Sequence, residues 1–252
     1  MIYSAALCTF AGFATALGAL AVIINGGMDK EKMSFFQGFA AGVMLSVSFL
    51  DLLSESYKNY NIYMPRPKAA RCVLSLFLCG AVIGAALARL SSPQIKEGEE
   101  QDIFTVRKMA LLTTVVMVLH NMPEGMLTMF AGVRDTSFGL KMAAAVALHN
   151  IPEGMAIAGP VLYTTKSAPK AFSQAFWAGM AEPIGGIGTY LFLKNFINRA
   201  FINGLMPIIG GIMIQTAVFH LIPSAIKISN IKHTICGIIT GIMVMSIGLL
   251  LF

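Results

Sequence analysis

Long apolar runs alternate with short polar clusters from one end of the chain to the other. Each apolar run has about 20 residues or more, which is enough for a helix to cross a bilayer. The pattern predicts an all-α integral membrane protein, a bundle of eight transmembrane helices in a single transmembrane domain covering residues 1–252. The predicted spans are about 1–25, 34–56, 69–90, 107–132, 138–163, 170–194, 201–226 and 231–252.

The connections between these spans are short except for residues 91–106, which contain Pro, Gly and several carboxylates and are predicted to form a solvated loop. No basic residue precedes the first apolar run, so we interpret it as a spanning helix rather than a cleaved signal. Small residues recur four positions apart, which allows helices to approach closely in lipid. This spacing indicates packing within the bundle; it permits a homodimer without requiring one.

Composition supports a membrane protein: 56% of the 252 residues are hydrophobic and 12% are charged, against roughly 25% charged in soluble domains. The net charge is +6, from 18 Lys and Arg against 12 Asp and Glu. The Lys and Arg lie at the ends of apolar runs and form no cluster. They are typical of interfacial anchors, so the expected partner is the lipid bilayer and not a nucleic acid. The four cysteines form no C-x-x-C pair, which argues against a thiolate zinc site.

A six-residue pattern occurs twice inside the apolar runs, as HNMPEG from His120 and as HNIPEG from His149. In each copy the His and the Glu (Glu124, Glu153) are four residues apart, so both project from one face of a helix. Imidazole nitrogen with carboxylate oxygen suits zinc, iron or manganese better than calcium or sodium. A charged group at the bilayer centre costs about 3 kcal/mol or more, so these carboxylates need a cation.

The prolines of the pattern, Pro123 and Pro152, cannot donate a backbone hydrogen bond and are expected to kink their helices. A third carboxylate, Glu182, precedes Pro183 in the next span. Each proline leaves the backbone carbonyl one turn earlier without its hydrogen-bond donor. Such a carbonyl is tolerated at membrane depth only where protein or a water-filled cavity satisfies it. The prolines therefore predict three kinked helices around a polar path.

Helix direction places the two patterns at one depth. The turn between the two spans falls near residues 134–137, and both histidines are about 20 Å from it at 1.5 Å per residue. Because the helices are antiparallel, the patterns become facing halves of one site, and Glu182 reaches the same layer. Asn121 and Asn150 could offer amide oxygens to a second position beside the first. A single copy would be equally compatible with a kinked helix and a satisfied histidine.

These motifs resemble those of the ZIP (Zrt/Irt-like) divalent-metal transporters, especially the bacterial zinc-transporting type. The resemblance rests on the tandem H-N-x-P-E-G patterns, the following Glu-Pro, GFAAGVML at residues 38–45 and AIAGPV after the second pattern. It implies a binuclear site between the fourth, fifth and sixth helices. The implied first position uses His120, Glu124, His149 and Glu153; the second uses Asn121, Asn150 and Glu182, with Glu124 and Glu153 bridging.

The resemblance also implies that the substrate is zinc, with iron, manganese and cadmium as further candidates, and that no organic cofactor is needed. It implies movement into the cytoplasm, both termini outside, and a bacterial inner (plasma) membrane. Two features depart from the family. The loop at 91–106 contains no histidine, and the seventh span reads FHLIPS, with His220, where relatives often have a Glu-containing stretch.

Four further polar residues are candidates for the metal pathway: Asp51, Glu55, Gln215 and His220. Asp51 and Glu55 are one helical turn apart, and either an uptake path or the interfacial polar end of a helix explains them. For His220, near Gln215, a hydrogen-bonded histidine at a kink is favoured over a transit ligand.

The predicted function is transport and not enzymatic catalysis. The alternative is an intramembrane metal-dependent enzyme, a hydrolase or a di-iron oxidase, because helix-borne Glu and His also build such sites. The chain has neither H-E-x-x-H nor Glu-x-x-His, and no Ser or Cys lies beside a histidine in a nucleophile pattern. A metal-sensing receptor would need a signalling domain, and the sequence shows none.

Overall fold

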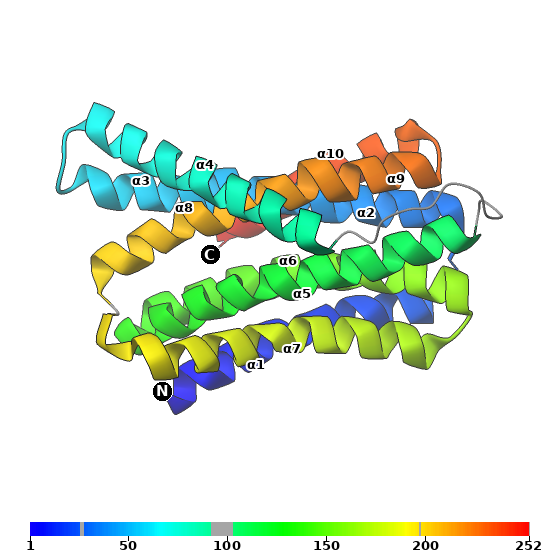
Figure 1. Cartoon of the computed structure of the whole chain (residues 1–252), viewed down its shortest axis with the longest axis horizontal. Coiled ribbons are helices and arrows are strands. Elements are labelled where there is room, and N and C mark those ends of the chain that lie inside the picture. Colours follow the sequence, from blue (N-terminus) through cyan, green and yellow to red (C-terminus); the bar gives the residue numbers. More distant parts are fainter. Residues whose placement is uncertain (26–27, 92–102, 197, 252) are drawn as a thin grey trace.

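The chain runs back and forth along one axis as eight antiparallel helical rods (Figure 1). The structure is a computed structural model that describes every residue except 26–27, 92–102, 197 and 252. The predicted all-α bundle is confirmed. Six rods are simple: α1 (Ile2–Ile24), α4 (Arg66–Ser91), α5 (Ile103–Arg134), α6 (Thr136–Thr165), α7 (Ala168–Leu193), which continues into the short 3₁₀ turn η2 (Lys194–Phe196), and α10 (Ile231–Leu251).

The second and seventh rods are composite, because each contains a π-helical segment. The second consists of α2 (Lys30–Ser46), η1 (Val47–Leu53) and α3 (Ser54–Asn61). The seventh consists of α8 (Arg199–Thr216), η3 (Ala217–Leu221) and α9 (Ile222–Ile228). Each π-segment changes which side chains face the bundle, and such segments are frequent at functional sites.

Side-chain caps start several of the helices. Asp135 accepts a hydrogen bond from the backbone N–H of Phe138 at 2.7 Å, which begins α6 directly after α5 ends. Lys166 ends α6 in the left-handed conformation, with φ of 51°. We call the two ends of the bundle the Arg134 end and the Lys166 end after these connections. Eight alternating passes bring both chain termini toward the Arg134 end (Figure 1).

Helix α5 begins at Ile103, four residues before the span predicted from the sequence. The last residues of the predicted loop at 91–106 are therefore helical, and Val106 is already buried in the bundle. The remainder of that loop, with its four carboxylates, lies outside the described residues.

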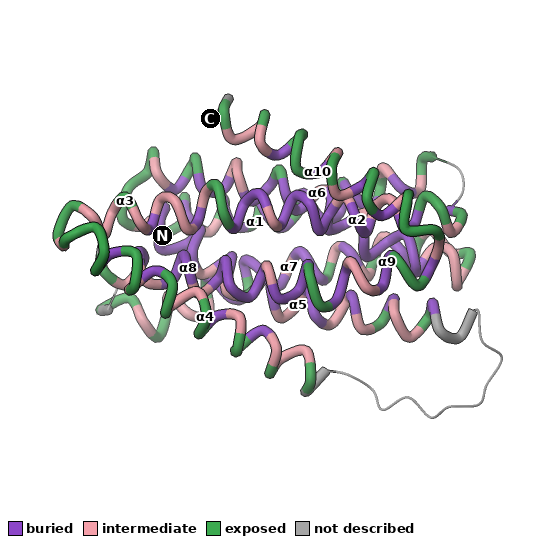
Figure 2. Tube along the Cα trace, turned by 90° about the horizontal axis from the view of Figure 1, so that it is seen from above, coloured by how far each residue is buried: buried purple, intermediate pink, exposed green. Residues whose placement is uncertain are grey.

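The helices form two groups. One contains α1, α5, α6 and α7, which contact one another in every pairing; in the other, α2 pairs with α10 and α4 pairs with α8. The groups meet where α2 contacts α6 and where α8 contacts α5. Burial is greatest in the middle of the bundle and falls off along α4 and α10 (Figure 2).

Glycines allow the outer pairs to form. A Cβ on Gly42 of α2 would lie 2.2 Å from the carbonyl oxygen of Ile238, and one on Gly241 of α10 would lie 2.2 Å from that of Phe39. Gly80 of α4 meets the backbone of α8 in the same way. These small residues serve packing within the chain. The possible homodimer stays a prediction.

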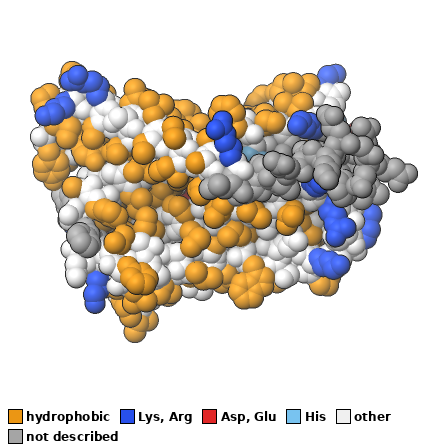
Figure 3. Space-filling model, in the orientation of Figure 1, with side chains coloured by type: hydrophobic (Ala, Val, Ile, Leu, Met, Phe, Trp, Pro, Cys, Tyr) orange, Lys and Arg blue, Asp and Glu red, His pale blue; other side chains and the backbone are white. Residues whose placement is uncertain are grey.

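Within the part of the chain that the structure describes, six of the rods are long and apolar enough to cross a membrane. The other two, α6 and α7, carry polar residues and prolines in their middle turns, which lowers their hydropathy. Hydrophobic side chains cover much of the face seen in Figure 3, and most Lys and Arg lie toward its two ends. This distribution is that of a multi-pass integral membrane protein.

Candidate metal centre

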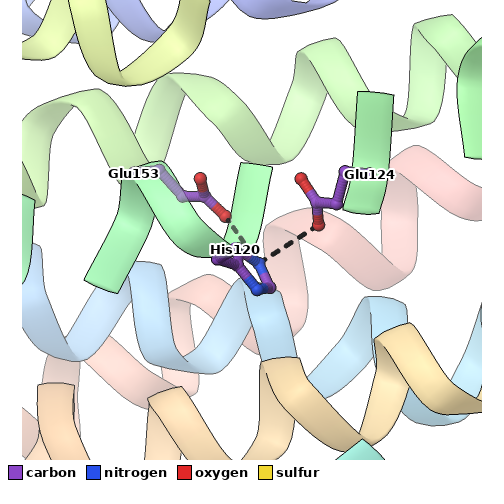
Figure 4. Close-up of side chains that lie close together, drawn as sticks. All are labelled: His120, Glu124 and Glu153. Atoms are coloured by element: carbon purple, nitrogen blue, oxygen red, sulfur yellow. Dashed lines mark ion pairs between the residues drawn. The ribbon is translucent and has the colours of Figure 1, made fainter. Parts of the chain in front are cut away.

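The centre of the bundle holds a cluster of one histidine and two glutamates. His120 and Glu124 project from the same face of α5, and Glu153 reaches them from α6 (Figure 4). His120 Nε2 lies 3.2 Å from Glu124 Oε1 and 3.6 Å from Glu153 Oε1. One ligand atom from each residue lies within 4.8 Å of the others, which is close enough for one ion to contact all three.

His149 extends the cluster from α6. Its Nε2 lies 3.2 Å from each oxygen of Glu124. His149 therefore contacts the glutamate of the other pattern across the α5–α6 interface, and His120 contacts both Glu124 on its own helix and Glu153 across the interface. This is the facing arrangement that the antiparallel spacing predicts. The structure brings together all four residues of the implied first position.

The three residues of the implied second position lie beside α1 and α7. The Asn121 amide donates to the carbonyl of Ala178 on α7 at 3.0 Å. The Asn150 amide donates to the carbonyl of Ala11 on α1 at 2.8 Å and to the carboxylate of Glu182. Because the amide nitrogens donate to these acceptors, both side-chain oxygens are oriented away from them. Neither oxygen accepts a hydrogen bond from a described residue.

All seven of these polar residues are buried, with Glu153 and Glu182 at 0% exposure. Several of their acceptor atoms have no hydrogen-bond partner among the described residues, including both oxygens of Glu153 and Oε2 of Glu182. Buried carboxylates are costly unless they are paired or bind a metal. Two imidazoles cannot neutralise three carboxylates and also satisfy these oxygens. The chemistry of the donor set fits one or more divalent transition-metal ions.

The glycines that end the two patterns position the helices, which sequence reasoning did not anticipate. A Cβ on Gly125 would lie 2.0 Å from the carbonyl oxygen of Glu182, and one on Gly154 would lie 1.9 Å from that of Thr15 on α1. In addition, the Cys8 thiol of α1 donates to the carbonyl of Gly125 at 3.4 Å. The same six-residue pattern thus supplies the His and Glu of the cluster and also the glycine that lets α1 and α7 come close to α5 and α6.

The three predicted kink positions, Pro123, Pro152 and Pro183, all lie inside continuous helices. Pro152 and Pro183 are buried beside the glutamates that they adjoin. The kinks themselves stay a prediction.

On the side of the cluster toward the Arg134 end lies a small cavity of about 10 Å³, room for about one water molecule. Asp51 of η1 lines it together with His149 and Glu124. A larger cavity of about 230 Å³ opens at the Arg134 end itself and is lined by Glu55 and Asn59 of α3 and by Asp135. The two carboxylates predicted to line a pathway therefore follow one another toward the cluster.

A third cavity, of about 10 Å³, lies on the side toward the Lys166 end and is lined by His120 and by Thr216 of α8. Gln215 and His220 do not join the cluster. His220 Nε2 lies 3.1 Å from the hydroxyl of Thr113, in a hydrogen-bonded pair between η3 and α5. Gln215 is buried, and its Oε1 has no partner among the described residues.

Fold and site together define a multi-pass helical membrane protein with a buried His/Glu cluster between its helices that could hold a divalent metal ion. The family model described as ZIP zinc transporter matches residues 89–248, and the chain belongs to this family. Zinc transporter ZupT of Chlorobium phaeovibrioides is 33% identical over 99% of this chain and 98% of its own length. ZupT of Corynebacterium glutamicum is 32% identical over 100% of both, and that of Streptococcus mutans is 30% identical over 98% of this chain and 96% of its own.

Proposed function

We propose that this protein moves divalent transition-metal ions, zinc foremost, across the membrane through the His/Glu cluster. The observation that carries the proposal is that His120 contacts carboxylates from two different helices at the buried centre of the bundle. Its relatives are named as zinc transporters. Iron, manganese and cadmium suit the same ligands.

The proposed centre binds two ions. His120, His149, Glu124 and Glu153 hold the first, and Asn121, Asn150 and Glu182 hold the second, with Glu124 and Glu153 bridging. The unpartnered oxygens of the two asparagines support this assignment, because amide oxygen is a ligand that a second ion beside the carboxylates would use. The four positive charges of two ions nearly balance the three carboxylates.

The proposed route follows the three cavities, from Glu55 to Asp51, through the cluster, and out past His120 toward the Lys166 end. Gln215 and His220 lie on the Lys166 side and are proposed to line the way out. We assign the Arg134 end, with both termini, to the outside of a bacterial inner membrane, so transport is into the cytoplasm. The whole chain acts as one transport domain.

The direct test is zinc flux by the purified protein in sealed liposomes. A fluorescent zinc indicator inside the vesicles is expected to respond to external zinc only when the protein is present. Tight zinc binding without any flux would remove the transport proposal and would favour the enzyme alternative.

A second expected result concerns His120. His120→Ala should lower zinc affinity by at least about 10–100-fold. This is the range for groups that support a metal site without binding the ion, and a direct ligand should contribute no less. The helical content should be unchanged because α5 is held by contacts along its whole length. Zinc titration by calorimetry and circular dichroism measure the two effects; unchanged affinity would take His120 out of the ligand set.

A further inference from the structure

We propose that the cavity at the Arg134 end binds a small zwitterion, an α-amino acid with an apolar side chain, and that the bound ligand obstructs the entry of zinc. None of the seven polar residues of the metal centre lines this cavity, so the site is a separate one. Binding of the amino acid does not depend on the proposed function, whereas its effect on zinc flux rests on it.

The cavity has a volume of about 230 Å³ and is lined by both helix groups. Helices α3 and α8 line it from one group, and the connection from α5 to α6 lines it from the other. Pockets for drug-sized ligands have about 300–1,000 Å³. The cavity is therefore suited to a smaller molecule, of the size of an amino acid.

The charged groups of the cavity are only partly used by the chain itself. Glu55 is paired, because it accepts a hydrogen bond from Asn59 at 3.3 Å and lies 3.8 Å from Lys58 Nζ. Asp135 uses Oδ1 to cap α6 at 2.7 Å, and no described residue donates to its Oδ2. The Arg134 guanidinium has neither an ion pair nor a hydrogen bond within the described chain. The cavity thus offers one cation and one carboxylate oxygen to a ligand.

These two groups match the two charges of an amino acid. A guanidinium binds a carboxylate through two parallel hydrogen bonds, and a carboxylate oxygen accepts from an ammonium group. Asn203, whose side chain forms no hydrogen bond with a described residue, offers an amide to either charge. A bare metal ion would leave Arg134 without a partner and would be repelled by it. A zwitterion therefore satisfies this set of side chains better than a cation does.

Two apolar side chains complete the lining. Phe138 comes from the first turn of α6 and Ile202 from the first turn of α8. They give an apolar side chain of the ligand a surface on which it leaves water. Carboxylate, ammonium and apolar side chain on one carbon atom each have a counterpart in the cavity. Contact at all three also distinguishes the two enantiomers of the ligand.

The position of the cavity explains why its ligand would affect transport. Glu55, the first residue of the proposed zinc route, lines the same cavity as Arg134 and Ile202. A bound amino acid occupies the space through which zinc reaches Glu55. It also bridges the two helix groups at the Arg134 end. External amino acid is therefore a brake on zinc entry.

The first test is calorimetric titration of the purified protein with L-leucine in the absence of zinc. Saturable binding is expected. Isoamylamine lacks the carboxylate and isocaproate lacks the ammonium group, and each should bind at least about 10-fold more weakly, because a hydrogen bond to a charged group is lost. Phosphoethanolamine carries both charges without the apolar side chain. Tighter binding of phosphoethanolamine than of leucine would indicate a lipid headgroup site and overturn the assignment.

Three variants assign the ligand contacts. Arg134→Gln should weaken leucine binding at least about 10-fold. Asp135→Asn should also weaken it, and it is expected to fold because asparagine caps a helix as well as aspartate does. The control is Arg89→Gln, which removes an exposed arginine at the Lys166 end and should match the wild type. Absence of leucine binding, or wild-type affinity in Arg134→Gln, would overturn the proposal.

The second test measures zinc flux into proteoliposomes with external L-leucine, at a free zinc concentration that a zinc buffer holds constant. Leucine is expected to lower the flux of the wild type and to have little effect on Arg134→Gln. D-Leucine chelates zinc as well as L-leucine does, so it is the control for chelation and should inhibit much less. Equal inhibition by both enantiomers would overturn the effect on transport. Absence of zinc flux in the wild type would defeat the transport proposal, while calorimetry would still test the amino-acid site.

Discussion

Glu124→Ala is expected to reduce zinc flux at least about 100-fold, toward that of protein-free liposomes, since even supporting groups of metal sites contribute up to that factor. Glu124 is the residue with the most contacts in the cluster. Its carboxylate touches both histidines, at 3.2 Å from each Nε2, and it is 2% exposed. Removing it deprives both proposed ion positions of a shared ligand and leaves two imidazoles facing each other.

The isosteric variant Glu124→Gln separates charge from volume. It keeps the shape of the side chain, so a similar loss of flux would show that the negative charge is what the site requires. Glu31→Gln is the matched control, because Glu31 lies on the surface, where its carboxylate is 3.6 Å from His233. Flux in Glu124→Ala that stayed near the wild-type rate would exclude the cluster as the transport path.

The cluster could be predicted from the sequence because its chemistry is local and repeated. His and Glu at four-residue spacing must share a helix face, and two antiparallel helices with equal distances to their turn must bring such faces to one depth. The contacts of His149 with Glu124 and of His120 with Glu153 have this geometry. The number of spans could likewise be predicted. A helix needs about 20 apolar residues to cross a bilayer, so each apolar run of that length counts as one span.

The π-segments could not be predicted in this way. Residues 47–53 and 217–221 are mostly apolar and contain no Gly or Pro to mark a change of winding. Their geometry depends on tertiary packing, here of the second and seventh rods against the site helices. As a result, the sequence could nominate Asp51 but not show that it shares a cavity with His149. It also could not show that His220 pairs with Thr113.

The role of the final glycine of each pattern could likewise not be predicted from the sequence. Its role depends on a partner more than 50 residues away for Gly125 and more than 100 for Gly154 by chain position. Close approach of backbones leaves no local trace in a sequence that is rich in small residues. The structure shows that α7 crosses Gly125 at Glu182, so this glycine sets the distance between two proposed ligands.

Gly125→Ala is therefore expected to destabilise the protein by about 1–3 kcal/mol, the usual cost of overpacking a core. The added Cβ would lie 2.0 Å from the Glu182 carbonyl oxygen and 2.5 Å from its carbon, both backbone atoms that cannot rotate away. Helices α5 and α7 must move apart, and Glu182 moves with α7. Zinc affinity should fall as well, although no ligand has been changed. Thermal unfolding in detergent and zinc titration measure both effects.

Gly188→Ala is the matched control on α7, because a Cβ there would meet nothing within 4 Å. It should leave zinc affinity unchanged, and it should raise helix stability by up to about 1 kcal/mol from propensity alone. Wild-type affinity in Gly125→Ala would show that the bundle can relax around the extra methyl without disturbing the ligands. Loss of affinity in Gly125→Ala but not in Gly188→Ala would show that the spacing between α5 and α7 is itself part of the metal centre.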